Sequence, residues 1–264
     1  MDTHAKNRFP TAALAGALAG AVTGALVAGL MAFAILAIFL LAPTEATMGD
    51  VQRILYVHVA SAWCGLASFL VAAVGGAVYL VRRDLGWDHW AQAAGELSWL
   101  GCGLTLVTGS LWARAAWGVW WTWDPRLTSV FVLWTIASAY LFVRSGVEDP
   151  HRRARAGAVL AVLGALDVPL VVVAARWFRG VHPGAPEMDP RMRLALLVSV
   201  LAFSALFAAL VAHRRGLLRL QARLDAWEAA ADQRQAAQGG ATPPRPDPAE
   251  RRHHHEKELP WVRS

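Results

Sequence analysis

The stretch "YVHVASAWCGLASFLVAAVGGAVYLV", residues 56–81, decides the fold, because it contains no Asp, Glu, Lys or Arg. A helix needs about 20 apolar residues to cross the hydrocarbon core of a bilayer, where it satisfies its own backbone hydrogen bonds. The chain has 264 residues and is 56% hydrophobic, more than is usual for a soluble domain. Similar runs occupy residues 11–42, 93–113, 127–144, 156–175 and 194–212. We therefore predict an all-α polytopic membrane protein, a bundle of six transmembrane helices.

The polar gaps between these runs predict the orientation. Gaps on the side of residues 1–10 and 82–92 carry more Lys and Arg near helix ends than the gaps on the other side. The positive-inside rule therefore places both termini in the cytoplasm and the gap after residue 113 outside. The first run is longer than the apolar region of a signal peptide, so we expect a retained helix, with a cleaved signal peptide as the alternative.

The composition changes after residue 212. We expect a membrane domain over residues 1–212 and a cytoplasmic tail over 213–264. Residues 214–235 have the amphipathic pattern of a helical continuation. The stretch "QGGATPPRPDPAE" that follows has the composition of a disordered linker.

Small and polar residues recur at helical spacing in the second and third runs. Such stripes are typical of close helix contacts in lipid. They comprise His58, Ser61, Gly65, Ser68, Ala72 and Gly75 in one run, and Gly95, Ser98, Cys102, Thr105 and Gly109 in the next. We interpret Cys64 and Cys102 as buried small hydrophobic residues. In the fifth run, Asp167 must face the bundle, and Pro169 cannot donate to the carbonyl near Ala165.

A tryptophan-rich stretch, "WGVWWTWDPRLTS" (residues 117–129), joins the third and fourth runs. Trp gathers at membrane interfaces, so an interfacial belt is one interpretation. With Trp112, however, the stretch would form a broad apolar wall with N–H donors at its edges, which suits a flat ligand. The indoles concerned are Trp112, Trp117, Trp120, Trp121 and Trp123.

Charged residues follow these indoles directly. Asp124 before Pro125 is a typical helix start, with Asp as the N-cap and Pro in the first helical position. Arg126 would lie in the first turn, where a cation opposes the helix dipole. We therefore expect Arg126 to need an anion, either Asp124 or a ligand carboxylate.

Two histidines, His58 and His182, fall on the same predicted outer face as the tryptophans. Each by itself is typical of a polar residue at an interface. Together with the aromatic wall and the nearby arginines, they match the needs of haem: axial nitrogens for iron, flat faces for the macrocycle and cations for the propionates.

Residues 117–129 closely resemble the tryptophan-rich signature of the haem-handling proteins of cytochrome c biogenesis, and the six runs around them resemble the CcmC family. The resemblance covers about residues 15–212. It implies that the external loop between the third and fourth helices holds haem b, through Trp117, Trp120, Trp121, Trp123, Asp124 and Arg126. It also implies that His58, in "YVHVASAW", and His182, in "WFRGVHPG", are the axial ligands of the iron.

The same resemblance implies a bacterial inner-membrane protein that presents haem, on the periplasmic side, to the periplasmic haem chaperone CcmE. It would act with the ATP-binding cassette proteins CcmA and CcmB, the small membrane protein CcmD and membrane lipid. The basic charge is explained by topology, so we expect no nucleic acid partner. Because the sequence contains neither a nucleophile paired with a base nor a P-loop, we do not expect an enzyme.

Three alternatives remain. A haem lyase, which joins haem to apocytochrome c, belongs to larger relatives with further spans and histidines. A permease subunit for haem or another solute in an ABC-type complex would use Asp167 and Pro169 as a broken-helix site. An electron-transferring b-type cytochrome would place His pairs on facing helices at membrane depth.

Overall fold

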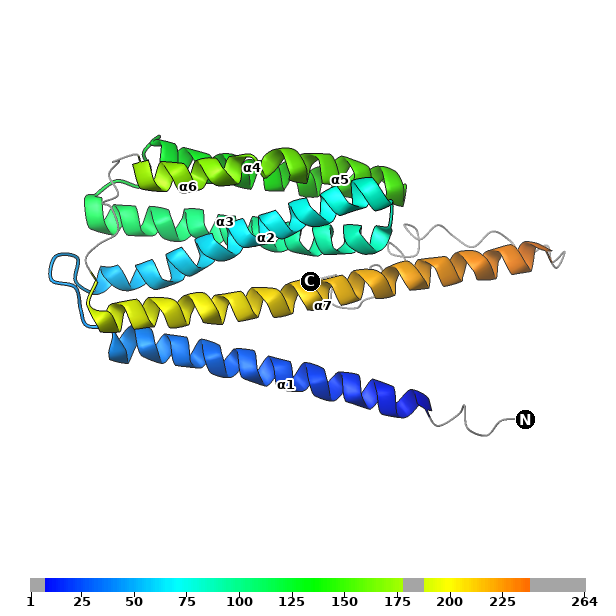
Figure 1. Cartoon of the computed structure of the whole chain (residues 1–264), viewed down its shortest axis with the longest axis horizontal. Coiled ribbons are helices and arrows are strands. Elements are labelled where there is room, and N and C mark those ends of the chain that lie inside the picture. The colour runs from blue at the N-terminus through cyan, green and yellow to red at the C-terminus, as the bar shows by residue number, and fades with distance from the viewer. Residues whose placement is uncertain (1–7, 178–187, 238–264) are drawn as a thin grey trace, which may run out of the picture. The chain divides into compact units, whose positions relative to one another are not determined.

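The computed structural model describes residues 8–177 and 188–237, and the predicted all-α fold is confirmed (Figure 1). A π-helical turn, η1 (Ala37–Leu41), extends the first helix, and a 3-10 turn, η2 (Asp50–Arg53), precedes the second. The α-helices are α1 (Arg8–Leu36), α2 (Ile54–Arg82), α3 (Leu85–Trp117), α4 (Pro125–Ser145), α5 (Pro150–Gly164), α6 (Asp167–Trp177) and α7 (Pro190–Ala237).

The chain divides into two compact units, residues 1–219 and 220–264. In the first unit, α4, α5 and α6 lie together, and α2 and α3 pack against them (Figure 1). The part of α7 that belongs to this unit packs on the other side of α2 and α3, and α1 packs against α7.

The second unit, where the structure describes it, is the end of α7, and the helix predicted over 214–235 is present. The predicted domain boundary after residue 212 falls inside this helix and stays a prediction. The predicted disordered linker lies in residues 238–264, outside the described residues.

Helices α2 and α3 are in contact along the predicted stripes of small residues. A Cβ atom added to Gly65 would lie 2.9 Å from the backbone nitrogen of Cys102, and one added to Gly101 would lie 2.8 Å from the Cα of Gly65. The Ser98 hydroxyl donates across the interface to the Gly65 carbonyl at 2.9 Å. The two cysteines, as predicted, are buried free thiols. This close backbone contact fixes α2 against α3 and thereby positions His58 on its neighbour.

The fifth predicted run forms two helices rather than one. Helix α5 ends at Gly164 and α6 begins at Asp167, although a single helix was expected over 156–175. Pro169 has no N–H to donate to the Ala165 carbonyl, which instead accepts from the Val168 N–H at 3.3 Å. The Oδ2 atom of Asp167 is buried at this break and has no hydrogen-bond partner among the described residues.

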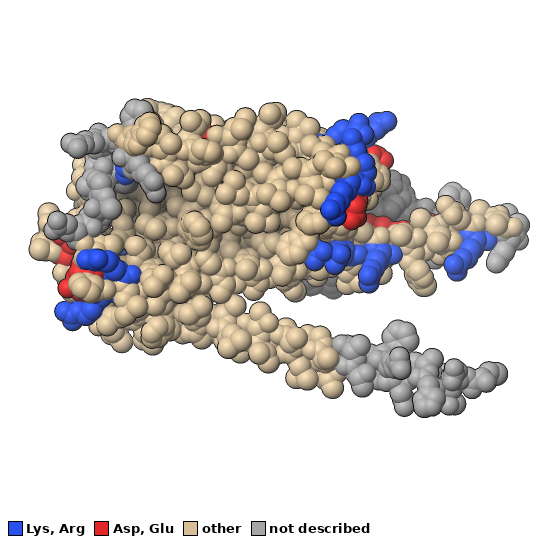
Figure 2. All heavy atoms as spheres, in the orientation of Figure 1, with Lys and Arg blue, Asp and Glu red and all other residues tan. Residues whose placement is uncertain are grey.

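The helices are distributed as expected for a polytopic membrane protein. In the described part of the chain, five segments are long and apolar enough to cross a membrane: Leu14–Leu41, Asp50–Arg82, Pro125–Ser145, Pro150–Ala174 and Pro190–Ala237. Helix α3 is not among them, but it is a further long helix of the bundle, with 33 residues, and packs against α2, α4 and α5. Figure 2 shows charged side chains gathered at the two ends of this bundle and a nearly uncharged band between them.

Candidate functional site

The tryptophan-rich loop between α3 and α4 is fixed at both ends by helix caps. Helix α3 ends at Trp117, and Gly118 adopts a left-handed conformation (φ 76°), which suits glycine best. The Gly118 N–H donates to the Arg114 carbonyl at 3.1 Å and so closes the last turn of α3. The loop therefore leaves α3 in a defined direction.

Asp124 is the N-cap of α4, as predicted. Its Oδ1 atom accepts from the backbone N–H groups of Arg126 and Leu127 at 2.9 and 3.0 Å. Its Oδ2 atom accepts from the Thr122 hydroxyl at 2.8 Å, and Pro125 occupies the first helical turn. All these contacts are local, so the helix start and the loop end are held by one carboxylate.

His58 lies in the second turn of α2 and contacts α3. Its Nδ1 atom is 3.0 Å from the Thr108 hydroxyl oxygen, and this hydroxyl donates to the Leu104 carbonyl at 2.7 Å. Because a hydroxyl has only one proton to donate, this geometry suits an Nδ1–H that donates to Thr108. We assign this tautomer, in which the lone pair is on Nε2.

Gly109 makes room for this histidine. A Cβ atom at Gly109 would lie 3.0 Å from His58 Cε1, so the ring lies directly on the backbone of α3. Trp112 contacts the ring edge, with centroids 5.9 Å apart and an interplanar angle of 63°. Trp112 is only 6% exposed, and its ring is 5.6 Å from that of Trp117. A chain of ring contacts thus leads from His58 to the loop.

A second aromatic cluster lies where the loop enters α4. The Trp121 ring is 5.5 Å from that of Trp123 and 6.0 Å from that of Phe131. The Trp123 ring is 6.2 Å from Phe131, and all three pairs meet edge to face. The Trp121 Nε1 atom is buried without a hydrogen-bond partner among the described residues. These contacts form part of the aromatic wall that the sequence predicts.

Two loop indoles are open to the surroundings, since Trp120 is 58% exposed and Trp123 is 74% exposed. The Arg114 guanidinium lies 5.9 Å from the centroid of the Trp120 ring. Arg126 is half-buried in the first turn of α4, where its backbone N–H reaches Asp124. The second predicted ligand, His182, lies outside the described residues. The roles of these residues in haem binding stay predictions.

Sequence reasoning missed three residues that the structure places beside the predicted site. Thr108 fixes the His58 ring, Arg114 covers Trp120 and Phe131 completes the second aromatic cluster. Thr108 is 50 positions from His58, so no local pattern could have linked them. Phe131 carried a weak signal, because it lies two turns after the Asp124 cap at the same end of α4.

The other described histidines near the membrane domain lie at the opposite end of the helices. The Nδ1 atom of His151 is 3.1 Å from the Tyr79 hydroxyl, so this ring joins α5 to α2. His89 is near the start of α3, and His213 is exposed on α7. Among the described residues there is no group of three or more His, Cys, Asp or Glu side chains able to hold a metal ion.

Comparison with known proteins identifies the family. The family description "Heme exporter protein C" (CcmC) matches residues 4–229 of the chain. A protein named Heme exporter protein C from Bradyrhizobium diazoefficiens is 34% identical over 192 residues, which cover 69% of this chain and 73% of that protein. The protein of the same name from Escherichia coli K12 is 30% identical over 191 residues, or 70% of this chain and 78% of that protein.

The relative from Paracoccus denitrificans, also named Heme exporter protein C, is 31% identical over 182 residues, which cover 66% of this chain and 76% of that protein. The family match extends over nearly the whole described helical body, including the tryptophan-rich loop and the His58 turn. On this evidence, the chain belongs to the Heme exporter protein C family.

Proposed function

We propose that this protein binds haem b at the outer face of the bacterial inner membrane and delivers it to the periplasmic haem chaperone CcmE. Membership of the Heme exporter protein C family supports a role in haem handling for cytochrome c maturation. The same names indicate a transport or delivery component rather than an enzyme. The finer assignments, to a chaperone and to particular residues, rest on the local geometry and the resemblance described above.

The observation that carries the proposal is the hydrogen bond between His58 and Thr108. Haem iron takes axial ligands from neutral imidazole nitrogens, and a ligating histidine usually donates its other N–H to an acceptor that fixes the ring. Thr108 is such an acceptor, and it is itself fixed by its bond to Leu104. This contact supports His58 as an axial ligand, through Nε2 in the tautomer that we assign. We assign the second axial position to His182.

The loop fits the remainder of a haem molecule. Its exposed indoles, Trp120 and Trp123, present apolar faces. The ring of Trp117 contacts that of Trp112, and the ring of Trp121 contacts that of Phe131. The buried Trp121 N–H has no partner among the described residues, and such a donor is the kind of group that a bound molecule satisfies. We assign the propionates to Arg126. Asp124 holds the loop end in place through its cap contacts.

Delivery requires other proteins. Energy from ATP would come from CcmA and CcmB, because this sequence has no P-loop, and CcmD would complete the complex. In this proposal both termini are cytoplasmic, and the site faces the periplasm, where the chaperone would take up the haem. Haem, held by two imidazoles outside the bilayer, would be the cargo. The protein would orient the haem and shield it from water.

A permease for haem or another solute is the second candidate, favoured by one observation. The break between α5 and α6 leaves the Asp167 Oδ2 atom buried without a partner among the described residues. Discontinuous helices of this kind form substrate sites in transporters. Asp167→Asn should abolish transport by a permease but leave haem binding at the outer loop unchanged.

The absorbance spectrum of the purified protein with added haem tests the main proposal. The His58→Ala/His182→Ala variant should lose the low-spin haem spectrum and should no longer transfer haem to the chaperone. His213→Ala is the matched control, because this exposed histidine lies at the opposite end. A normal spectrum in the double variant would show that His58 and His182 are not the axial ligands. Normal transfer of haem despite a lost spectrum would show that delivery does not depend on this site.

A further inference from the structure

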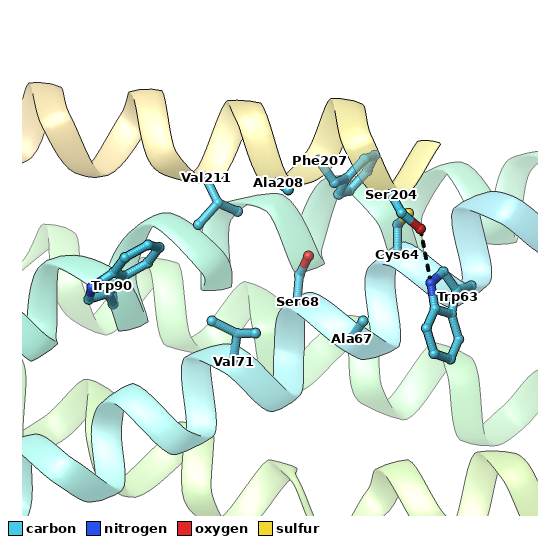
Figure 3. Close-up of a pocket in the computed structure, with 10 residues that line it drawn as sticks. All are labelled: Trp63, Cys64, Ala67, Ser68, Val71, Trp90, Ser204, Phe207, Ala208 and Val211. Atoms are coloured by element: carbon cyan, nitrogen blue, oxygen red, sulfur yellow. Dashed lines mark hydrogen bonds between the residues drawn. The ribbon is translucent and has the colours of Figure 1, made fainter. Parts of the chain in front are cut away.

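An apolar groove lies between α2 and α7, far from the tryptophan-rich loop in sequence and not used by the proposed function. Its volume is about 300 Å³. Figure 3 shows Trp63 at one end and Trp90 at the other, with aliphatic and small side chains between them. The walls include Ala67 and Val71 from α2 and Ala208 from α7. No histidine lines it.

The end of the groove at Trp63 is closed by a contact between the two helices. The Trp63 Nε1–H donates to the Ser204 hydroxyl at 3.1 Å (Figure 3). Ser204 in turn donates to the Val200 carbonyl at 2.6 Å. The hydrogen bonds of these polar groups are therefore made within the protein, and this end of the groove favours an apolar occupant.

Two arginines lie beyond the end of the groove at Trp90. Val211 lines the groove, and Arg215 and Arg219 follow it at steps of four residues on the same face of α7. The Arg215 guanidinium lies over the Trp90 ring, 4.1 Å from its centroid. The groove is thus mostly apolar along its length, with positive charge beyond its end at Trp90.

These two arginines differ from their neighbour. Arg214 forms an ion pair with Glu96, with two hydrogen bonds to its carboxylate. Neither Arg215 nor Arg219 has a carboxylate within ion-pair distance in the described part of the chain, and the buried Nε atom of Arg215 has no hydrogen-bond partner there. Like charges at this spacing repel one another. The structure therefore leaves positive charge at this end uncompensated.

His89 responds to the same charge. Burial lowers the pKa of His89, and the positive charges of Arg219, Arg144 and Arg215 lower it further, against the opposite effect of Asp88. The imidazole therefore lies within the positive field of these arginines. A bound anion would relieve the repulsion between the two α7 arginines.

We propose that this groove binds one anionic phospholipid, with an acyl chain between α2 and α7 and its phosphate against Arg215 and Arg219. Basic pockets between transmembrane helices bind anionic headgroups on the cytoplasmic side of a membrane, and the proposed orientation places this end there. An acyl chain matches the mostly apolar walls of the groove, and a phosphate matches the positive charge beyond its end at Trp90.

Native mass spectrometry of the full chain in detergent tests this site, with equimolar palmitoyl-oleoyl phosphatidylglycerol and palmitoyl-oleoyl phosphatidylcholine. The protein should retain one phosphatidylglycerol in preference to phosphatidylcholine. Arg215→Gln/Arg219→Gln should reduce this preference by about fivefold for each arginine. Arg155→Gln removes the same charge from an exposed position on α5 and should leave the preference unchanged.

The acyl chain has its own test. Ala208→Trp fills the groove and should reduce retention of both lipids, and Ala208→Leu should do so to a smaller extent. Ala212→Trp, at an exposed position of α7 that does not line the groove, is the control. The proposal is overturned if the arginine variants keep the preference, if Arg155→Gln loses it equally, or if haem displaces the lipid. Because none of these readouts uses haem transfer, failure here is distinguishable from failure of the proposed function.

Discussion

Arg144 on α4 donates two hydrogen bonds to the Asp88 carboxylate on α3, at 2.7 and 2.8 Å, and both residues are buried. Arg144 also donates to the Gln92 side chain at 2.7 Å. Gly157 on α5 makes room for the guanidinium, because a Cβ atom there would lie 2.8 Å from Arg144 Nη1. This pair therefore fixes α3, α4 and α5 to one another at the end of the bundle opposite the tryptophan-rich loop.

Arg144→Gln should lower the free energy of unfolding by about 3–5 kcal/mol, because it leaves the Asp88 charge buried and uncompensated. Denaturant titration in detergent micelles measures this loss. Arg191→Gln is the matched control, since Arg191 pairs with Asp189 at 3.6 Å with both side chains largely open to solvent. Its effect should be below about 1 kcal/mol. Equal losses in the two variants would show that the buried pair has no special role.

Thr108→Val should reduce haem affinity by about tenfold while leaving helix packing intact, because it removes the acceptor of the His58 Nδ1–H but keeps the side-chain volume. Haem titration followed by absorbance measures this change. Thr105→Val is the control on the same helix, because its buried hydroxyl donates only along α3, to the Gly101 carbonyl. If both variants bind haem like the parent, Thr108 does not orient the ligand.

Asp124→Asn should keep the abundance of the protein in the membrane, because Asn also caps helices, whereas Asp124→Ala should cost about 1 kcal/mol of stability. Immunoblotting of membranes and thermal unfolding give the two readouts. The Asn variant distinguishes helix capping by this residue from a role of its charge in haem binding. If its abundance and haem retention both equal those of the parent, capping is the whole role of this residue. If haem retention alone falls, its charge serves the ligand.

The helices were predictable because their signals are local. The apolar run over 194–212 and the amphipathic pattern after it predicted α7, and the Asp-Pro pair at 124 and 125 predicted the start of α4. The small-residue stripes predicted the contact of α2 with α3. Each of these features depends on residues within a single stretch of the chain.

The parts that sequence reasoning missed depend on distant residues. Arg144 ends the apolar run over 127–144, and no local pattern indicates that it is buried on a carboxylate 56 positions away. The Thr108 acceptor and the groove at Trp90 likewise require the packing of different helices. At the break before Asp167 the proline was recognised, but its local signal could not indicate whether the helix would bend or end.

Impermeant thiol labelling tests the orientation on which every site assignment depends. Val119 is exposed in the loop, and Glu148 is exposed in the turn before α5. In a background without Cys64 and Cys102, Val119→Cys should be labelled in intact cells and Glu148→Cys only after lysis. The reverse pattern would place the tryptophan-rich loop in the cytoplasm.

Trp120→Ala/Trp123→Ala should reduce haem retention without reducing the abundance of the protein in the membrane. Both indoles are exposed, so their removal leaves no cavity in the bundle. Each indole is expected to contribute roughly 1 kcal/mol through apolar contact with the porphyrin, so the pair should weaken retention by about 30-fold. Trp227→Ala is the matched control, because Trp227 is 74% exposed, like Trp123, but lies near the end of α7. Haem content at equal protein abundance is the measurement. If the double variant retains haem as well as Trp227→Ala does, these two tryptophans form only an interfacial belt, and the wall that binds haem must be sought elsewhere.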